Sequence, residues 1–177
     1  QDQEIWPKLF HLQKTYSEFL SLQFVSLAQI DFWGTKEGDL LAKNFKLNNG
    51  ILGGVLVPPF DRPRIIKSLS DMLLLAKKYK LEVDLHIDES SVEPGLGMKI
   101  LLNTIEKLNS NVKVTCSHSS SLLLLKDSDL TKLANRMAKK NITVIALPLT
   151  NFWLLNRQEK NTISRPVAPI KQLQKAF

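Results

Sequence analysis

The segment Val83-Asp-Leu-His-Ile-Asp-Glu89 carries the strongest indication of both fold and site. We predict a β-strand over residues 82–86. Asp84 and His86 are two residues apart and therefore point to the same side of that strand, which in a barrel is the interior. Glu89 lies three residues beyond His86, so it reaches the same side only if the strand ends there and the chain turns inward. The segment thus predicts a strand that presents polar groups to a pocket.

Patterns typical of strands and helices alternate on both sides of this segment. Short apolar runs predict further strands at 22–29, 51–57, 112–118 and 142–147. Helical spacing of apolar residues predicts helices at 8–20, 37–45, 63–79, 94–109 and 128–140. Strands that alternate with helices imply parallel pairing through right-handed crossovers, hence an α/β fold. Either an open doubly wound sheet or a (β/α) barrel satisfies this order, but no glycine-rich fingerprint of nucleotide binding follows any predicted strand.

Polar residues recur where the predicted strands end, which is where α/β barrels place their chemistry. They are Gln29, His86 with Glu89, His118, and the segment Pro148–Asn151. A histidine that binds a divalent metal, beside a carboxylate that moves protons, can direct water at a carbon atom. The alternative is a hydrogen-bonded core histidine next to an exposed acidic loop. Cys116, two residues before His118 and so on the same face of its strand, is interpreted as a small buried residue.

Two strand-end histidines are too few for a hydrolytic metal centre, which usually has at least three protein ligands. His11, the remaining histidine, falls on the polar side of the first predicted helix and is expected at the surface. The site predicted from the sequence is therefore incomplete.

The composition excludes few functions. With 44% hydrophobic and 23% charged residues the chain should fold. The net charge of +7 comes from residues 126–177, which hold 10 Lys or Arg and 3 Asp or Glu. These basic residues are spread over helix-like stretches without interleaved aromatics, so we expect a solvated helix face and no nucleic-acid partner. The apolar runs are too short to cross a membrane, and the single cysteine demands no oxidising compartment, so a cytoplasmic location is expected.

Four motifs in order resemble cytosine deaminase and its close relatives in the amidohydrolase superfamily. They are Asp84-Leu-His-Ile-Asp-Glu89, Val114-Thr-Cys-Ser-His118, Ala146–Asn151 continuing through Arg157, and Arg165-Pro-Val-Ala-Pro-Ile-Lys171. The resemblance runs from about Gln13 to the end of the chain. It implies a (β/α)₈ TIM barrel, of which residues 1–177 would form one incomplete domain with roughly strands 3 to 7 and their helices.

The resemblance also implies roles for individual residues. His86 would be the metal ligand from the fifth barrel strand, and Glu89 would shuttle protons between metal-bound water and a ring nitrogen. His118 would be the sixth-strand histidine, which holds the attacking hydroxide in mononuclear members and ligates a second metal in binuclear relatives. Gln29 would read the amide edge of a pyrimidine. The implied cofactor is one divalent metal ion, Fe²⁺ or Zn²⁺.

This sequence departs from the family pattern at both ends. It contains no His-x-His pair, and it stops inside the helix that should precede the eighth strand and its aspartate. We therefore expect a fragment, inactive alone, whose remaining metal ligands lie outside these residues.

The predicted activity is metal-dependent hydrolytic deamination of cytosine or a related heterocycle. The alternatives are a triazine amidohydrolase of the N-alkylammelide type, or a non-catalytic degenerate barrel that serves as an interaction module. We expect a small-molecule heterocyclic substrate, and the protein could form a homo-oligomer.

Overall fold

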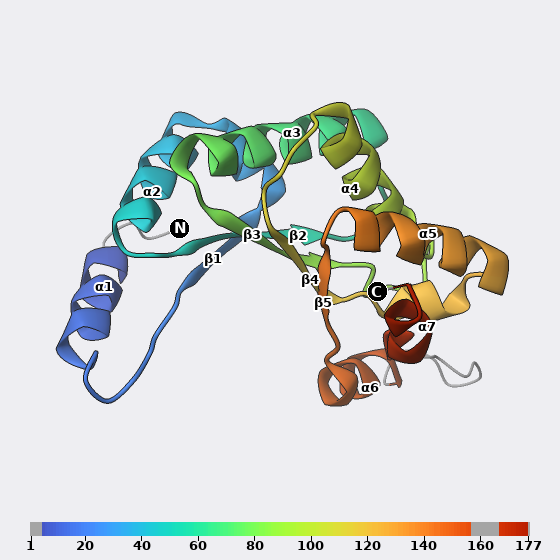
Figure 1. The fold of residues 1–177 in the computed structure, drawn as a ribbon. Coiled ribbons are helices and arrows are strands. Elements are labelled where there is room, and N and C mark those ends of the chain that lie inside the picture. Colours follow the sequence, from blue (N-terminus) through green and yellow to red (C-terminus); the bar gives the residue numbers. More distant parts are fainter. Residues whose placement is uncertain (1–4, 157–166, 177) are drawn as a thin grey trace.

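Five parallel strands form one sheet in the computed structural model, which describes residues 5–156 and 167–176 (Figure 1). Arg157, Arg165 and Pro166, which belong to motifs quoted above, lie outside these ranges. The strands pair in chain order: β1 (Val25–Gln29), β2 (Ile51–Leu56), β3 (Glu82–Ile87), β4 (Val114–His118) and β5 (Thr143–Ile145).

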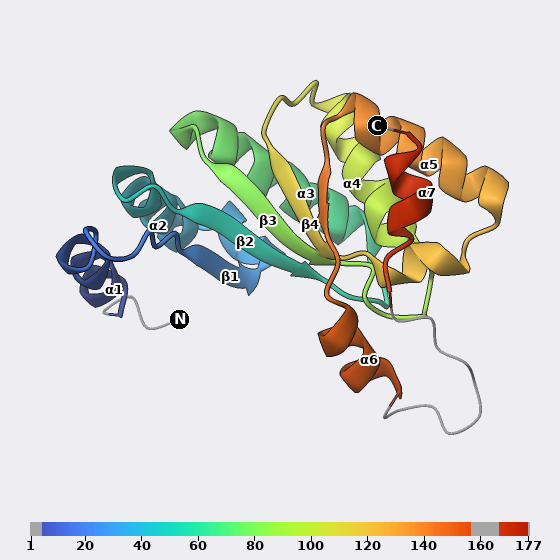
Figure 2. The same ribbon diagram turned by 60° about the horizontal axis from the view of Figure 1, so that its bottom comes forward.

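Helices connect the strands. They are α1 (Ile5–Thr15), α2 (Lys36–Leu47), α3 (Arg62–Tyr79), α4 (Leu96–Lys107), α5 (Asp127–Lys139), α6 (Pro148–Asn156) and α7 (Ile170–Gln174), with 3₁₀ turns η1 (Ile30–Gly34) and η2 (Ser120–Leu124). The helices α3 and α4 lie along one face of the sheet (Figure 2). A doubly wound sheet reverses its strand order and carries helices on both faces. The sequential order with helices on one side is that of a barrel segment, so the prediction of an incomplete TIM barrel is confirmed.

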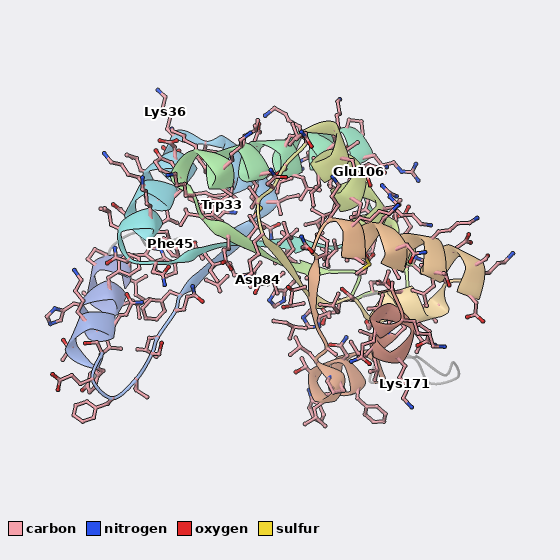
Figure 3. All side chains as sticks on the ribbon, in the orientation of Figure 1. Trp33, Lys36, Phe45, Asp84, Glu106 and Lys171 are labelled. Carbon is pink, nitrogen blue, oxygen red and sulfur yellow. The ribbon has the colours of Figure 1, made fainter. Side chains whose placement is uncertain are left out.

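The two faces of the sheet differ in burial. Leu52, Leu85 and Cys116 face the helices and are fully buried. On the opposite face Leu27 is 42% exposed and Val25 is 37% exposed. Figure 3 shows Trp33 on the helix side and Asp84 on the other side of the strands. The core therefore lies between sheet and helices, and the inner face of the barrel segment is open within the described chain.

Local interactions set the helix starts. The Thr35 side chain accepts a hydrogen bond from the Gly38 N–H and begins α2, and Asp61 does the same for Arg64 at α3. The indole N–H of Trp33 donates to the Gly53 carbonyl at 2.9 Å, which ties η1 to β2. None of the helices within residues 5–156 and 167–176 is long and apolar enough to cross a membrane.

Several predicted elements were wrong in extent. The strand expected over 22–29, for example, begins at Val25. The first helix was expected over 8–20 but ends at Thr15, and Phe19 is 80% exposed because no described element covers the turn that follows. The last strand was expected to reach residue 147 but ends at Ile145. Pro148 opens α6 three residues later, as a proline can at a first helical position.

Gly54 in β2 is predicted to leave no room for a larger side chain. A Cβ at this position would lie 2.7 Å from Ile30 Cγ2 and 3.0 Å from Leu85 Cδ2, both buried. Gly54→Ala should therefore lower the free energy of unfolding by about 1–3 kcal/mol through overpacking. Urea denaturation followed by the fluorescence of buried Trp33 measures this. The half-exposed Leu74→Ala on α3 is the control and should change stability by less than about 1 kcal/mol. Equal urea midpoints for Gly54→Ala and the unsubstituted protein would contradict the packing argument.

Candidate active site

His86 lies at the carboxyl end of β3 on the open face of the sheet. Asp84 shares that face one row deeper, as the spacing of two residues predicts, and both are half-buried. Strand pairing places His86 in one row across all five strands with Gln29, Val55, Ser117 and Ile145. The row marks the mouth of the barrel segment.

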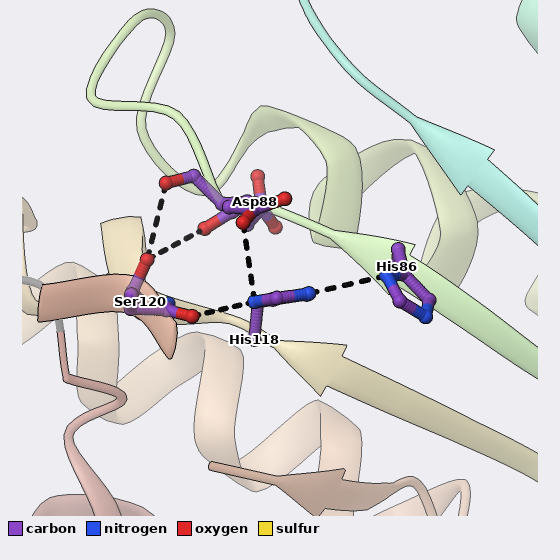
Figure 4. Close-up of polar contacts among 6 residues, drawn as sticks. His86, Asp88, His118 and Ser120 are labelled. Carbon is purple, nitrogen blue, oxygen red and sulfur yellow. Dashed lines mark hydrogen bonds and ion pairs between the residues drawn. The ribbon is translucent and has the colours of Figure 1, made fainter. Parts of the chain in front are cut away.

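His118 reaches His86 through a turn of the backbone. Cys116 and His118 were expected on the same face of β4, and this was wrong. Cys116 is buried against the helices, where burial raises the pKa of its thiol and keeps it neutral. His118 and Ser119 adopt left-handed backbone conformations, with φ of 71° and 48°, which turn the His118 ring toward the open side. His118 Nε2 then lies 3.1 Å from His86 Nδ1 (Figure 4).

Glu89 joins the two histidines because β3 ends at Ile87. Asp88 has a φ of 53° and turns the chain, which meets the condition set by the sequence. Glu89 Oε1 lies 3.4 Å from His118 Nδ1. The side chain of Asn151, from the first turn of α6, contacts the same nitrogen through Oδ1 at 2.6 Å. The sequence marked the segment containing Asn151 but not this contact.

Asp88 is a second residue that the sequence analysis missed. Its buried carboxylate accepts hydrogen bonds from the N–H groups of Gly97 at 3.1 Å and Met98 at 2.8 Å, in the first turn of α4. Its carbonyl accepts from the Ser121 N–H at 2.8 Å, and the Ser120 hydroxyl donates to the Glu89 carbonyl at 3.2 Å. These bonds clamp the loop after β3 to the loop after β4.

Burial shapes the charges of the two aspartates. It raises the pKa of Asp88 to about 6, although the N–H groups of Met98 and Gly97 favour the carboxylate. Burial also raises the pKa of Asp84, against the attraction of His86 and a hydrogen bond from the Ser117 hydroxyl.

Gln29 lies apart from this cluster. Strand β2 separates it from His86, and it lines a hollow of about 190 Å³ with Asp31, Arg64 and other residues of β2 and α3. Arg64 and Asp31 form an ion pair beside it. The structure thus brings together His86, His118 and Glu89, and places Gln29 at the same end of the sheet but not in contact.

The donor chemistry fits one divalent metal ion at His86. None of the described residues hydrogen-bonds Nε2 of His86, and the ring lies on the open face with this nitrogen available as a ligand. Within the described ranges no group of three or more His, Cys, Asp or Glu side chains could hold a metal ion. A closed centre of the usual three or more protein ligands would need donors beyond them.

Comparison with solved structures defines the class of barrel. No protein-family model matches the chain. A 5-methylcytosine deaminase from Klebsiella pneumoniae liganded with phosphonocytosine has a TM-score of 0.81 at 20% identity, over 99% of this chain and 43% of that one. An N-isopropylammelide isopropylaminohydrolase from Burkholderia multivorans has a TM-score of 0.70 at 20% identity, over 96% and 40%. The chain thus has the fold of these hydrolases.

Curated sequences point to the same class. A pterin deaminase from Rhizobium rhizogenes is 27% identical over 153 residues, which are 85% of this chain and 34% of that protein. An uncharacterized protein, YahJ, from Escherichia coli is 32% identical over 79 residues, 44% of this chain and 17% of that one. The resemblance to hydrolytic deaminases of the amidohydrolase superfamily is confirmed, and the chain spans about a third of the pterin deaminase it matches.

The clamp at Asp88 should appear in the pH dependence of stability. A carboxyl whose pKa rises from 3.8 to about 6 on folding holds its proton more tightly in the folded state. Its contribution is complete below about pH 4 and is lost as the pH rises to about 6, by an amount on the order of 3 kcal/mol. Asp88→Asn removes the titration, so the difference in unfolding free energy between unsubstituted protein and variant should shift by this amount over that window. Urea denaturation at pH 4, 5, 6 and 7 measures it, and parallel pH profiles would refute the assignment.

Proposed function

We propose that the protein containing this chain is a metal-dependent hydrolytic deaminase of cytosine or a related pyrimidine-like heterocycle. The observation that carries the proposal is the cluster of His86, His118 and Glu89, at the carboxyl ends of neighbouring strands of a barrel segment. Perturbed or coupled polar groups at this end of a barrel are where catalysis is expected. The fold shared with two hydrolases of nitrogen heterocycles supports the same reaction class.

The metal would be one divalent ion, Fe²⁺ or Zn²⁺, held by His86 together with ligands from outside the described residues. When bound, such an ion lowers the pKa of water and makes a nucleophile available at neutral pH. Glu89 would accept a proton from the attacking water and deliver it to a ring nitrogen of the substrate. His118 would accept a hydrogen bond from the attacking water at Nε2, in place of the contact that this nitrogen makes with His86.

The proposed reaction is a hydrolysis, in which water replaces the amine on the ring carbon. Water adds to the amine-bearing ring carbon, so that a carbon–oxygen bond forms while the adjacent ring nitrogen takes the proton carried by Glu89. The hydroxyl proton of this adduct then passes to the amine, the carbon–nitrogen bond breaks, ammonia leaves, and a carbonyl remains. Gln29 offers an amide donor and acceptor, which suit the amide edge of a pyrimidine. It lies in a separate hollow, two strands from His86, where it would contact the far edge of the ring.

A triazine amidohydrolase is the second candidate, favoured by the structural likeness to N-isopropylammelide isopropylaminohydrolase. Its substrate presents a similar C–N edge, and pterin shares an aminopyrimidinone edge with cytosine. A non-catalytic interaction module is the candidate of another class. Ammonia release by the full protein across cytosine, triazine and pterin substrates, with and without added Fe²⁺ or Zn²⁺, separates the three. Absence of turnover and of bound metal would favour the module.

Glu89→Gln tests the proton transfer. The amide keeps the size of the side chain but cannot take a proton, so kcat for ammonia release should fall about 10²- to 10⁴-fold. The matched control is Glu106→Gln, which loses only the ion pair with Arg136 on the outer surface of α4 and should keep normal kcat. Undiminished turnover by Glu89→Gln in the metal-loaded full protein would refute this role.

Gln29→Leu tests substrate recognition separately from chemistry. Loss of a hydrogen bond worth about 1 kcal/mol should raise KM roughly fivefold, with kcat changed less than about threefold. Steady-state kinetics on the best substrate found above would show this. A variant with unchanged KM would place substrate recognition elsewhere.

A further inference from the structure

Asn151 is the most buried polar partner of the proposed site. Its side chain is inaccessible to solvent, and its Oδ1 lies 2.6 Å from His118 Nδ1. Its Nδ2 has no hydrogen-bond partner among the described residues. A buried amide nitrogen without a hydrogen bond costs free energy. A strong interaction at Oδ1 must therefore hold the Asn151 side chain in this orientation.

This contact determines where the His118 proton lies. An amide oxygen can only accept a hydrogen bond, so Nδ1 of His118 must donate. The Glu89 carboxylate, 3.4 Å from the same nitrogen, is a second acceptor. Turning the Asn151 amide over would require an unprotonated Nδ1, whose lone pair would then face the carboxylate of Glu89. Both Asn151 and Glu89 therefore favour a proton on Nδ1 of His118.

The proton at Nδ1 leaves Nε2 of the neutral ring with its lone pair, directed at His86. In the 3.1 Å contact between the rings, His118 Nε2 accepts and His86 Nδ1 donates. His86 then keeps its lone pair on Nε2, the nitrogen that no described residue hydrogen-bonds. One amide thus sets the tautomers of two rings.

We propose that Asn151 is a positioning residue that fixes His118 in the tautomer protonated at Nδ1, and through it prepares both histidines for the reaction. This inference rests on the proposed function for its purpose, but the tautomer itself can be measured without metal or substrate. The start of α6 supplies the rigidity, because Pro148 opens the helix and the Asn151 N–H donates to the Leu147 carbonyl at 2.9 Å.

The test is long-range ¹H–¹⁵N NMR of the full protein labelled at histidine nitrogens, metal-free, at a pH where the rings are neutral. We expect a protonated Nδ1 and an unprotonated Nε2 at His118. Asn151→Leu removes the acceptor and should give a mixture of tautomers or the opposite one. Asn151→Asp presents only oxygens and should keep the proton at Nδ1. Asn135→Leu, on an exposed position of α5, is the surface control and should leave the tautomer unchanged.

Metal binding gives a second readout. Loss of the partner that orients a site histidine typically lowers metal affinity about 10- to 100-fold, so Asn151→Leu should do so and the surface control Asn135→Leu should not. If Asn151→Leu fails to fold, Asn151→Ala, which is smaller and offers no side-chain acceptor, takes its place. A proton found at Nε2 of His118 in the unsubstituted protein, or an unchanged tautomer in a folded Asn151→Leu or Asn151→Ala, would overturn the inference. If the tautomers are as expected but the full protein releases no ammonia, the proposed function is refuted and the inference about Asn151 stands.

Discussion

The candidate site depends on one buried carboxylate. Asp88 binds two N–H groups at the start of α4 and, through its backbone, the loop that follows β4. Glu89 follows Asp88 in the sequence. His118 begins the turn after β4, and the Asp88 carbonyl accepts a hydrogen bond from this turn. The turn that brings Glu89 inward and the turn that brings His118 inward are therefore held by the same residue. The packing of α4 against the sheet therefore affects the distance between Glu89 and His118, the two catalytic candidates.

Much of this arrangement could be predicted from the sequence because it follows from regular periods. Parallel strands alternate with helices, so the order of elements predicts the topology, and a spacing of two residues places Asp84 and His86 on one face. The carboxyl ends of parallel strands meet at one edge, so strand-end polar residues gather there. These inferences need only φ and ψ values that every residue of a strand or helix shares.

The features that could not be predicted depend on single residues, several of which have φ and ψ values outside the strand and helix regions. Strand parity places His118 on the helix side with Cys116, and only the left-handed conformations at His118 and Ser119 reverse it. The early end of α1 reflects missing packing partners for Phe19, which helical spacing cannot foresee. Asn151 is 33 residues from His118 and on a helix whose apolar pattern is weak, so its contact exists only in three dimensions.

An amide suits position 151 better than a carboxylate because Glu89 already places a negative charge beside His118. Glu89 places one carboxylate beside His118 Nδ1, in a position where the ring is almost fully buried. A second carboxylate would hold the proton at Nδ1 equally well, but two negative neighbours would stabilise the imidazolium form, in which Nε2 also carries a proton. A doubly protonated ring can neither accept a hydrogen bond from His86 nor tolerate a nearby metal ion. A neutral oxygen acceptor orients the ring without adding that charge, which leaves Glu89 as the group that exchanges protons.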